Sequence, residues 1–428
     1  MKFKIVCRHP HASNQEENWL YDNRTGKITD PAGVEKTYWL DPRFIRLTPP
    51  NERLLRCFSP DNPIVGKSRR LNKLKIQVGL ACNRHCTYCM QKSFRSAKAV
   101  VARPESVKRF ITSLEKNDIR LQKNAAVEFW GGEPLIYFKT IKELVPALKT
   151  YAGTELRFSM VTNGTLLTDE IVDALVENGV NTAISHDGPG FNLRGGKDPL
   201  DDSKLKAVWL RLFEKSSAGG LFPQFHTVLT PENCRIDEIR KFFDERFFPG
   251  VPISFEGIVR GEPFFSREAA RQLDASLFRM TAGAPGRLPN LDYRIHELMN
   301  RLIFRVPMNR LPARCDNSSP HVVTVNMEGQ VLACQNRTPE FGGIGSTDAY
   351  DEIVNRRFTN PRLIERCRDC LVLVSCLCSC PILNEQERAE SCRNEFIYHT
   401  ALFGVAWFFL TGRILAGAYA IHEETADA

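Results

Sequence analysis

Short apolar runs and longer amphipathic segments alternate through the middle of the chain. Six runs rich in branched and aromatic side chains predict buried strands; they are Leu74–Leu80, Val127–Trp130, Leu156–Val161, Val180–Ser185, Phe222–Leu229 and Val251–Glu256. Four segments between them have the apolar spacing of amphipathic helices; they are Phe138–Thr150, Thr168–Asn178, Ser203–Ser216 and Ile236–Phe247. Thr168 precedes two acidic residues, as expected of an N-cap.

Strands that alternate with helices predict an α/β fold made of βαβ units with a parallel sheet. Six strands fit a partial, open (β/α)6 barrel of the TIM type, which we place at residues 71–260. In such barrels the functional groups gather at the carboxyl ends of the strands. One more helix, Arg267–Met280, is predicted in a bridging region, 261–312, that has little other periodicity.

The N-terminal residues 1–70 have a different pattern. Lys2–Cys7 and Trp19–Tyr21 alternate as strands do, and Asn23–Gly26 has the composition of a hairpin turn. We expect a small β-rich extension here. Whether it only packs on the barrel or also binds a peptide is left open.

The C-terminal residues 396–428 begin with a largely apolar stretch, 396–421. A membrane helix needs about 20 consecutive apolar residues, and charged and glycine residues such as Arg413 and Gly404 interrupt this stretch. We therefore expect a helix packed against the barrel and no membrane span. A contact with a membrane surface is the alternative.

The composition indicates a globular protein and a reducing compartment. The 428 residues are 43% hydrophobic and 25% charged, which is ordinary for a globular chain with a sizeable core. The net charge of +8 comes without a long basic tract, so no nucleic-acid partner is expected. The N-terminus lacks the apolar core of a signal peptide, which favours a reducing, cytoplasmic setting. There, the clustering of the fourteen cysteines favours metal over disulfides.

Three cysteines follow the first predicted strand. Cys82, Cys86 and Cys89 have the spacing C-x3-C-x2-C, with Tyr88 before the last sulfur. Thiolates bind iron–sulfur clusters, and three of them leave one iron of a [4Fe–4S] cube open to a small molecule. Half a zinc site or inert thiols are the alternatives.

Three motifs at later strand ends carry further polar groups. Gly131-Gly132-Glu133-Pro134 follows one strand, and its glycines allow close backbone approach to a ligand, while Glu133 can pair with an ammonium group. Asn163 follows the next strand, and Ser185-His186-Asp187 follows the one after. His186 and Asp187 are weak candidates for proton carriers, because turns of this composition are common without a function.

In this order, the motifs resemble those of the radical S-adenosylmethionine (SAM) superfamily. The resemblance implies that Cys82, Cys86 and Cys89 hold a [4Fe–4S] cluster to which SAM binds. It also implies that Gly131, Gly132 and Glu133 contact the methionyl amino group of SAM. Asn163 would reach its ribose or carboxylate, Ser185 would lie near the cofactor, and Tyr88 would either stack on adenine or merely pack.

The C-terminal cysteines have a spacing of their own. Cys315 is followed by Gly329-x4-Cys334, then by Cys367-x2-Cys370-x5-Cys376-x3-Cys380, and then by Cys392. Residues 313–395 thus resemble the seven-cysteine SPASM domain of radical SAM enzymes that modify peptides. The resemblance implies two auxiliary [4Fe–4S] clusters, a distal one on Cys367, Cys370, Cys376 and Cys392 and a proximal one on Cys315, Cys334 and Cys380.

The segment before Cys315 and the additional cysteine Cys378 depart from that pattern. Some relatives supply another proximal ligand just before the Cys315 position, where this chain has Asn309, Arg310 and Leu311. The proximal cluster is therefore expected to be one ligand short, and its open iron could take a substrate group or Cys378. Cys378 itself lies outside the pattern and is expected to be a spare thiol.

The resemblance implies a peptide maturase. A 5′-deoxyadenosyl radical would remove a hydrogen from a ribosomally made precursor peptide, which would then form a thioether, C–C or C–O crosslink. A flavodoxin- or ferredoxin-type protein would supply the electron. Formylglycine formation, as in anaerobic sulfatase maturases, ranks lower because Gln335 stands where those enzymes have an aspartate base. Epimerisation would need an exposed thiol, and a metal-cluster binding protein is the non-enzymatic alternative.

Overall fold

The structure is a computed structural model, which describes residues 1–10, 12–35, 67–92, 104–282, 288–306, 314–336, 365–380 and 383–421. Its larger sheet has eight strands in the order β11-β10-β4-β5-β6-β7-β8-β9. The strands from β4 to β9 run parallel to one another. Their bounds are β4 (Arg70–Gly79), β5 (Arg120–Gly131), β6 (Leu156–Thr162), β7 (Val180–Ser185), β8 (Gln224–Leu229) and β9 (Ile253–Ile258).

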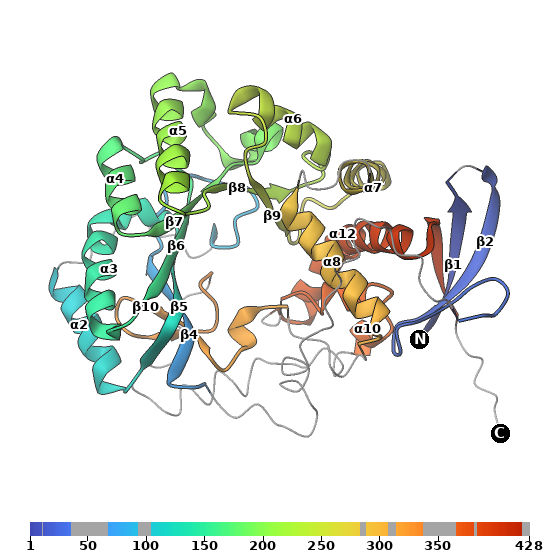
Figure 1. The fold of residues 1–428 in the computed structure, drawn as a ribbon, viewed down its shortest axis with the longest axis horizontal. Coiled ribbons are helices and arrows are strands. Elements are labelled where there is room, and N and C mark those ends of the chain that lie inside the picture. The colour runs from blue at the N-terminus through green and yellow to red at the C-terminus, as the bar shows by residue number, and fades with distance from the viewer. Residues whose placement is uncertain are drawn as a thin grey trace.

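Helices connect these strands and cover the outer face of the curved sheet (Figure 1). They are α2 (Pro104–Lys116), α3 (Phe138–Ala152), α4 (Asp169–Glu177), α5 (Ser203–Ala218), α6 (Ile236–Arg246) and α7 (Arg267–Thr281). Thr168 caps α4 as predicted, because its side chain accepts from the backbone N–H of Ile171 at 3.3 Å. The predicted α/β fold with a parallel sheet is confirmed. Helix α2 was not predicted.

The C-terminal cysteine region extends this sheet. Strand β10 (Val322–Asn326) pairs in parallel with β4, and β11 (Val331–Leu332) pairs antiparallel with β10. Neither strand was predicted. Their pairing joins segments about 250 residues apart, so no local pattern around β10 indicates its neighbour. The consequence is that Cys315 and Cys334, which flank this hairpin, lie beside the first strand of the barrel.

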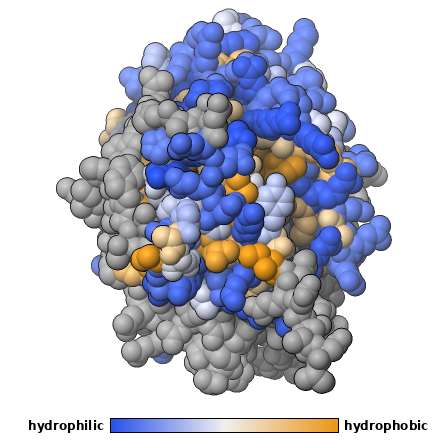
Figure 2. Space-filling view, turned by 90° about the vertical axis from the view of Figure 1, so that its right-hand side faces the viewer, coloured by the Kyte–Doolittle hydropathy of each residue, from blue (hydrophilic) through white to orange (hydrophobic). Residues whose placement is uncertain are grey.

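A second, four-stranded sheet joins the two ends of the described chain. Its order is β12-β1-β2-β3, and β1 is antiparallel to both neighbours. The strands are β1 (Lys2–His9), β2 (Ala12–Asp22), β3 (Lys27–Thr29) and β12 (Ile414–Ile421). The predicted β-rich N-terminal extension is thus present as far as residue 35, and residues 36–66, including Cys57, lie outside the described residues. Among the residues coloured in the view of this side, hydrophilic ones predominate, and hydrophobic ones lie across the middle (Figure 2).

The helix predicted in the apolar stretch 396–421 is present, but only as far as Thr411. Helix α12 (Glu385–Thr411) begins earlier, at a capping box made by Asn384 and Glu387. It ends at Gly412, whose φ of 67° is the left-handed conformation that favours glycine. The remainder of the stretch is β12, which pairs with β1. No helix among the described residues is long and apolar enough to cross a membrane.

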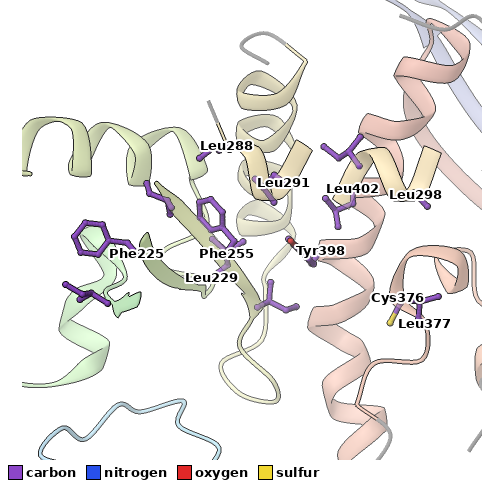
Figure 3. Close-up of a cluster of buried hydrophobic side chains, with 14 of the residues drawn as sticks. Phe225, Leu229, Phe255, Leu288, Leu291, Leu298, Cys376, Leu377, Tyr398 and Leu402 are labelled. Atoms are coloured by element: carbon purple, nitrogen blue, oxygen red, sulfur yellow. The ribbon is translucent and has the colours of Figure 1, made fainter. Parts of the chain in front are cut away.

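Helix α12 is largely apolar from Tyr398 onward, and most of these residues are buried. It packs on α7 and on α8 (Pro289–Ile303), a helix that was not predicted. On another side it meets the small sheet, where the ring centroids of Trp19 and Trp407 are 5.9 Å apart. Figure 3 shows one continuous core that runs from Phe225 and Phe255 of the barrel, across α8, to Leu402 of α12.

Candidate active site

A cavity of about 530 Å³ opens at the carboxyl ends of the barrel strands. Its wall includes the loop after β4, the residues that follow β5, β6 and β7, the ends of β8 and β9, and Arg294 of α8. Gln335 and Asn336, which follow Cys334, complete it on the side of the C-terminal cysteine region. The sequence-predicted residues that line it are Cys82, Cys86, Tyr88, Cys89, Gly132, Glu133, Asn163 and Ser185.

The cysteine loop is held against the segment that follows β5. The N–H groups of Gly132 and Glu133 donate to the carbonyl oxygens of Gly79 and Ala81, at 3.0 and 2.8 Å. A Cβ on Gly131 or Gly132 would stand 2.3 Å from those same oxygens. The glycines therefore allow the backbone to approach the cysteine loop, and only Gly132 of the two lines the cavity. The prediction that both glycines contact a ligand therefore fits Gly132, whereas Gly131 contacts the cysteine loop instead.

Glu133 is a buried carboxyl group with backbone partners. Its side chain is buried and accepts from the N–H groups of Leu135 and Asn163, at 2.9 and 2.7 Å, and from the hydroxyl of Thr162. No lysine or arginine among the described residues forms an ion pair with it. Burial raises the pKa of Glu133, so a cation that entered the cavity beside it would favour its charged form. An ammonium group fits this position.

Asn163 and Ser185 lie on the wall beside Glu133. The Asn163 side chain donates from Nδ2 to Asn83 of the cysteine loop at 2.8 Å, and its Oδ1 accepts from the N–H of Thr165. These hydrogen bonds fix the side-chain amide of Asn163 on the cavity wall, where it can also bind a polar ligand. Sequence reasoning placed both residues at strand ends, and the structure brings them together with the cysteines.

Tyr88 and Asp187 form one hydrogen-bonded group. The Tyr88 hydroxyl donates to Asp187 Oδ2, and Arg194 donates to Asp187 Oδ1 at 2.7 Å. Burial raises the pKa of Tyr88, so it stays a neutral donor. Asp187 is itself buried and also accepts from the N–H of Val228. Tyr88 reaches the cavity, whereas Asp187 lies behind its wall and positions Tyr88 and Arg194.

His186 also lies behind the wall. It is fully buried, and its Nδ1 accepts from the N–H of Gly188 at 3.0 Å, so its Nε2–H donates to Asp198 at 2.9 Å. The ring of Phe191 stacks on it with centroids 4.6 Å apart. Burial lowers the pKa of His186. These contacts favour a packing role over the proposed proton transfer.

Sequence reasoning missed a polar group on the far strands. Glu256 of β9 lines the cavity and accepts from Nδ1–H of His226 on β8 at 2.6 Å. Arg260 and Arg294 also line the cavity. The sequence signal is weak, because β8 and β9 contain other polar residues, such as Thr227 and Ser254.

The C-terminal cysteines gather at two places. Cys367, Cys370, Cys376 and Cys392 line one cavity of about 400 Å³, together with Cys378. Cys315, Cys334 and Cys380 lie close enough for their charges to interact: burial, then Cys380 and Cys315, raise the pKa of Cys334 to about 11. The two groups contain the members of the two predicted ligand sets, with Cys378 added to the first. Asn309, Arg310 and Leu311 lie outside the described residues.

Part of the chain matches a family model. Residues 76–243 match the model of the radical SAM superfamily. Radical SAM cyclopropyl synthase TigE of Paramaledivibacter caminithermalis is 27% identical over 159 residues, which are 35% of this chain and 34% of that protein. The cysteine-type anaerobic sulfatase-maturating enzyme of Clostridium perfringens is 26% identical over 180 residues, 39% of this chain and 46% of that protein.

The fold also resembles a solved structure described as native anSMEcpe with bound AdoMet. The TM-score is 0.54 at 19% identity, and the match covers 78% of this chain and 96% of that one. The chain spans less than half the length of the curated relatives it matches. It contains a radical SAM domain, and the two relatives named above are enzymes.

The residues present fit the groups that this superfamily uses. Three half-buried thiols from one loop face the cavity, and a buried carboxylate that pairs with no described lysine or arginine stands beside them. A [4Fe–4S] cluster would bind to Cys82, Cys86 and Cys89, and the SAM ammonium would bind near Glu133.

Proposed function

We propose that the chain is a radical SAM enzyme that modifies a ribosomally made precursor peptide by forming a crosslink within it. The observation that carries the proposal is the shared cavity. Its wall combines the three-cysteine loop and Glu133 with Gln335 and Asn336 from the C-terminal cysteine region. A substrate in this cavity would contact both the radical SAM domain and the region with the auxiliary cysteines.

When bound, the cluster and SAM supply a 5′-deoxyadenosyl radical that removes a hydrogen from the substrate. The chain's own residues orient and enclose the reactants. Glu133 fixes the amino end of SAM, and Asn163 and Ser185 bind its polar groups. The walls formed by β8 and β9 keep water from the radical. The predicted clusters on the C-terminal cysteines would accept the surplus electron, and the reductant would be of flavodoxin or ferredoxin type.

The peptide substrate is supported by the chemistry of the cavity and by a neighbour of similar fold. The structure described as native anSMEcpe with bound AdoMet and Cp18Cys peptide has a TM-score of 0.54. In this chain the wall of the cavity offers Glu256, Arg260 and Arg294 to a polar peptide.

Two other modifications rank lower on specific observations. Formylglycine formation would need a base at Gln335, whose side chain lies on the cavity wall but cannot take up a proton. Epimerisation would need a thiol hydrogen donor in the cavity. Cys7 and Cys234 are buried elsewhere, and Cys378 lines the other cavity. Among the described residues, the only cysteines that line the active-site cavity are Cys82, Cys86 and Cys89.

The test is SAM cleavage by the anoxically reconstituted protein with dithionite, followed by reaction with peptides encoded beside its gene. Formation of 5′-deoxyadenosine and a peptide lighter by two hydrogens supports the proposal. A colourless protein that contains zinc and cleaves no SAM would refute it and favour the metal-binding alternative.

A further inference from the structure

The active-site cavity contains a carboxylate to which the proposed binding of SAM gives no role. Among the described residues that line the cavity, the carboxyl groups are those of Glu133 and Glu256. Both oxygens of Glu133 accept hydrogen bonds from neighbouring N–H and hydroxyl groups. Glu256 comes from β9, which lies four strands further along the sheet than β5. It therefore stands apart from the carboxylate that we assign to SAM.

A β-bulge in β9 places Glu256 on the cavity wall. Along β8, the partners of two successive residues are Phe255 and Gly257, so Glu256 is the extra residue between them. Gly257 has a φ of 122°, which favours glycine. Bulges are frequent next to active sites, where they redirect a side chain. Here Phe255 stays buried, whereas the Glu256 side chain is 39% exposed and lines the cavity.

One oxygen of Glu256 is held by β8, and the other is left for a ligand. His226 Nε2 accepts from the side-chain amide of Gln224 at 3.0 Å, so its Nδ1–H donates to Oε1 of Glu256 at 2.6 Å. No hydrogen bond or ion pair from a described residue reaches Oε2. Burial acts to raise the pKa of Glu256, but the hydrogen bond from His226 and nearby positive charges outweigh it and lower the pKa. Glu256 is thus ionised.

The other polar groups on the wall do not replace it as a proton acceptor. The three cysteines are the expected cluster ligands, and the amide of Gln335 takes up no proton. Tyr88 is a neutral donor to Asp187. The guanidinium groups of the wall stay protonated. A proton that a substrate releases in this cavity therefore has Glu256 as its acceptor.

We propose that Glu256 is the catalytic base that takes the proton released when the crosslink forms, an inference that rests on the proposed function. One C–H bond of the peptide breaks, and its hydrogen atom goes to the 5′-deoxyadenosyl radical. As the new bond to this carbon forms, the S–H, O–H or C–H bond of the second group breaks, and its proton goes to Oε2 of Glu256. The remaining electron goes to an oxidised iron–sulfur cluster of the C-terminal cysteine region. Glu256 then releases the proton to water.

The test compares Glu256→Gln with Glu256→Asp in the anoxically reconstituted protein, with peptides encoded beside its gene as substrates. Glutamine keeps the shape of the side chain but accepts no proton, whereas aspartate keeps the acceptor on a shorter side chain. The measured quantity is the ratio of crosslinked peptide to 5′-deoxyadenosine. Because a general base contributes about 100-fold or more, this ratio should fall by about that factor in Glu256→Gln and by less in Glu256→Asp. An equal or smaller loss in the glutamine variant would overturn the proposal.

Two readouts do not depend on turnover. The iron content of Glu256→Gln and its Kd for the peptide should equal those of the wild type, as should those of the exposed control Glu155→Gln. A raised Kd with an unchanged product ratio would make Glu256 a recognition group and overturn its role as a base. Loss of iron or of 5′-deoxyadenosine formation would show a structural role and overturn it as well.

The wild type separates this inference from the proposed function. A wild-type protein that forms no crosslinked peptide contradicts the proposed function. Crosslinking by the wild type, together with an unchanged product ratio in Glu256→Gln, refutes only the assignment of Glu256 as the base.

Discussion

The cysteine loop of the barrel and the C-terminal cysteine region position their thiols by different means. In the barrel, Gly131 and Gly132 let one strand end lie against the next, and backbone hydrogen bonds hold the loop. In the C-terminal region, three successive non-glycine residues, Leu377, Cys378 and Ser379, adopt the left-handed conformation. Arg388 of α12 stabilises this segment by donating a hydrogen bond to the Cys378 carbonyl oxygen. The first arrangement depends on the sheet, and the second depends on helix α12, which follows soon after in the sequence. Cys315 and Cys334 flank a hairpin that pairs with β4 of the barrel, so the two regions share one sheet but hold their thiols by different contacts.

The largest expected effect separates the two regions by function. Cys86→Ala should abolish 5′-deoxyadenosine formation, because the cluster that SAM needs is lost. Cys315→Ala should spare cleavage that is uncoupled from product but prevent formation of the modified peptide. Both products can be measured by mass spectrometry, with Cys234→Ala, which alters a buried thiol outside the two regions, as the control. Cleavage by the Cys86 variant, or modification at the wild-type rate by the Cys315 variant, would break the comparison.

A smaller effect is expected from Glu133→Gln, which leaves the cysteines in place. Removing one member of a buried charge pair costs about 3 kcal/mol or more, so the Kd for SAM should rise about 100-fold or more. Equilibrium dialysis with labelled SAM measures it, and the exposed Glu155→Gln is the control. Unchanged SAM affinity would mean that Glu133 is only a structural carboxylate.

Gly132→Ala tests the role of backbone contact in the barrel. Its Cβ would stand 2.3 Å from the Ala81 carbonyl oxygen, and we expect a loss of about 3 kcal/mol in unfolding free energy. The control is Gly153→Ala, which meets nothing within 4 Å and should lose only about 1 kcal/mol from its left-handed φ. Urea unfolding measures both free energies. Equal losses would contradict the claim that the close approach of Gly132 to the cysteine loop stabilises the fold.

The smallest effect concerns pH. Because burial lowers the pKa of His186 below its ordinary 6.5, the unfolded chain binds a proton in this range that the folded chain does not. Unfolding free energy should therefore fall as pH falls below about 6.5, by up to about 1.4 kcal/mol per unit from this group. His186→Gln should show a shallower slope in urea unfolding between pH 7.5 and 5.5. An unchanged slope would show that His186 titrates normally in the folded state.

The barrel was predictable because its signals are local. Each strand is a short apolar run, and each site motif follows directly on a strand end, so Glu133, Asn163 and Ser185 could be placed before their contacts were known. The superfamily resemblance added the roles expected of them.

The remaining features depend on contacts between distant segments. The pairing of β10 with β4, the strand β12 and the His226–Glu256 pair have no counterpart in local periodicity. The backbone of Cys378 could not be foreseen either, because left-handed conformations are signalled by glycine and the chain has none there. The grouping of the cysteines followed from the resemblance.

The most direct test of the account is the iron and sulfide content of the anoxically reconstituted protein beside that of the Cys82/Cys86/Cys89 triple alanine variant. The account predicts iron and sulfide for three cubes in the wild type, falling by one cube in the variant. Iron for a single cube that is lost entirely in the variant would contradict it, because the C-terminal cysteines would then hold no clusters.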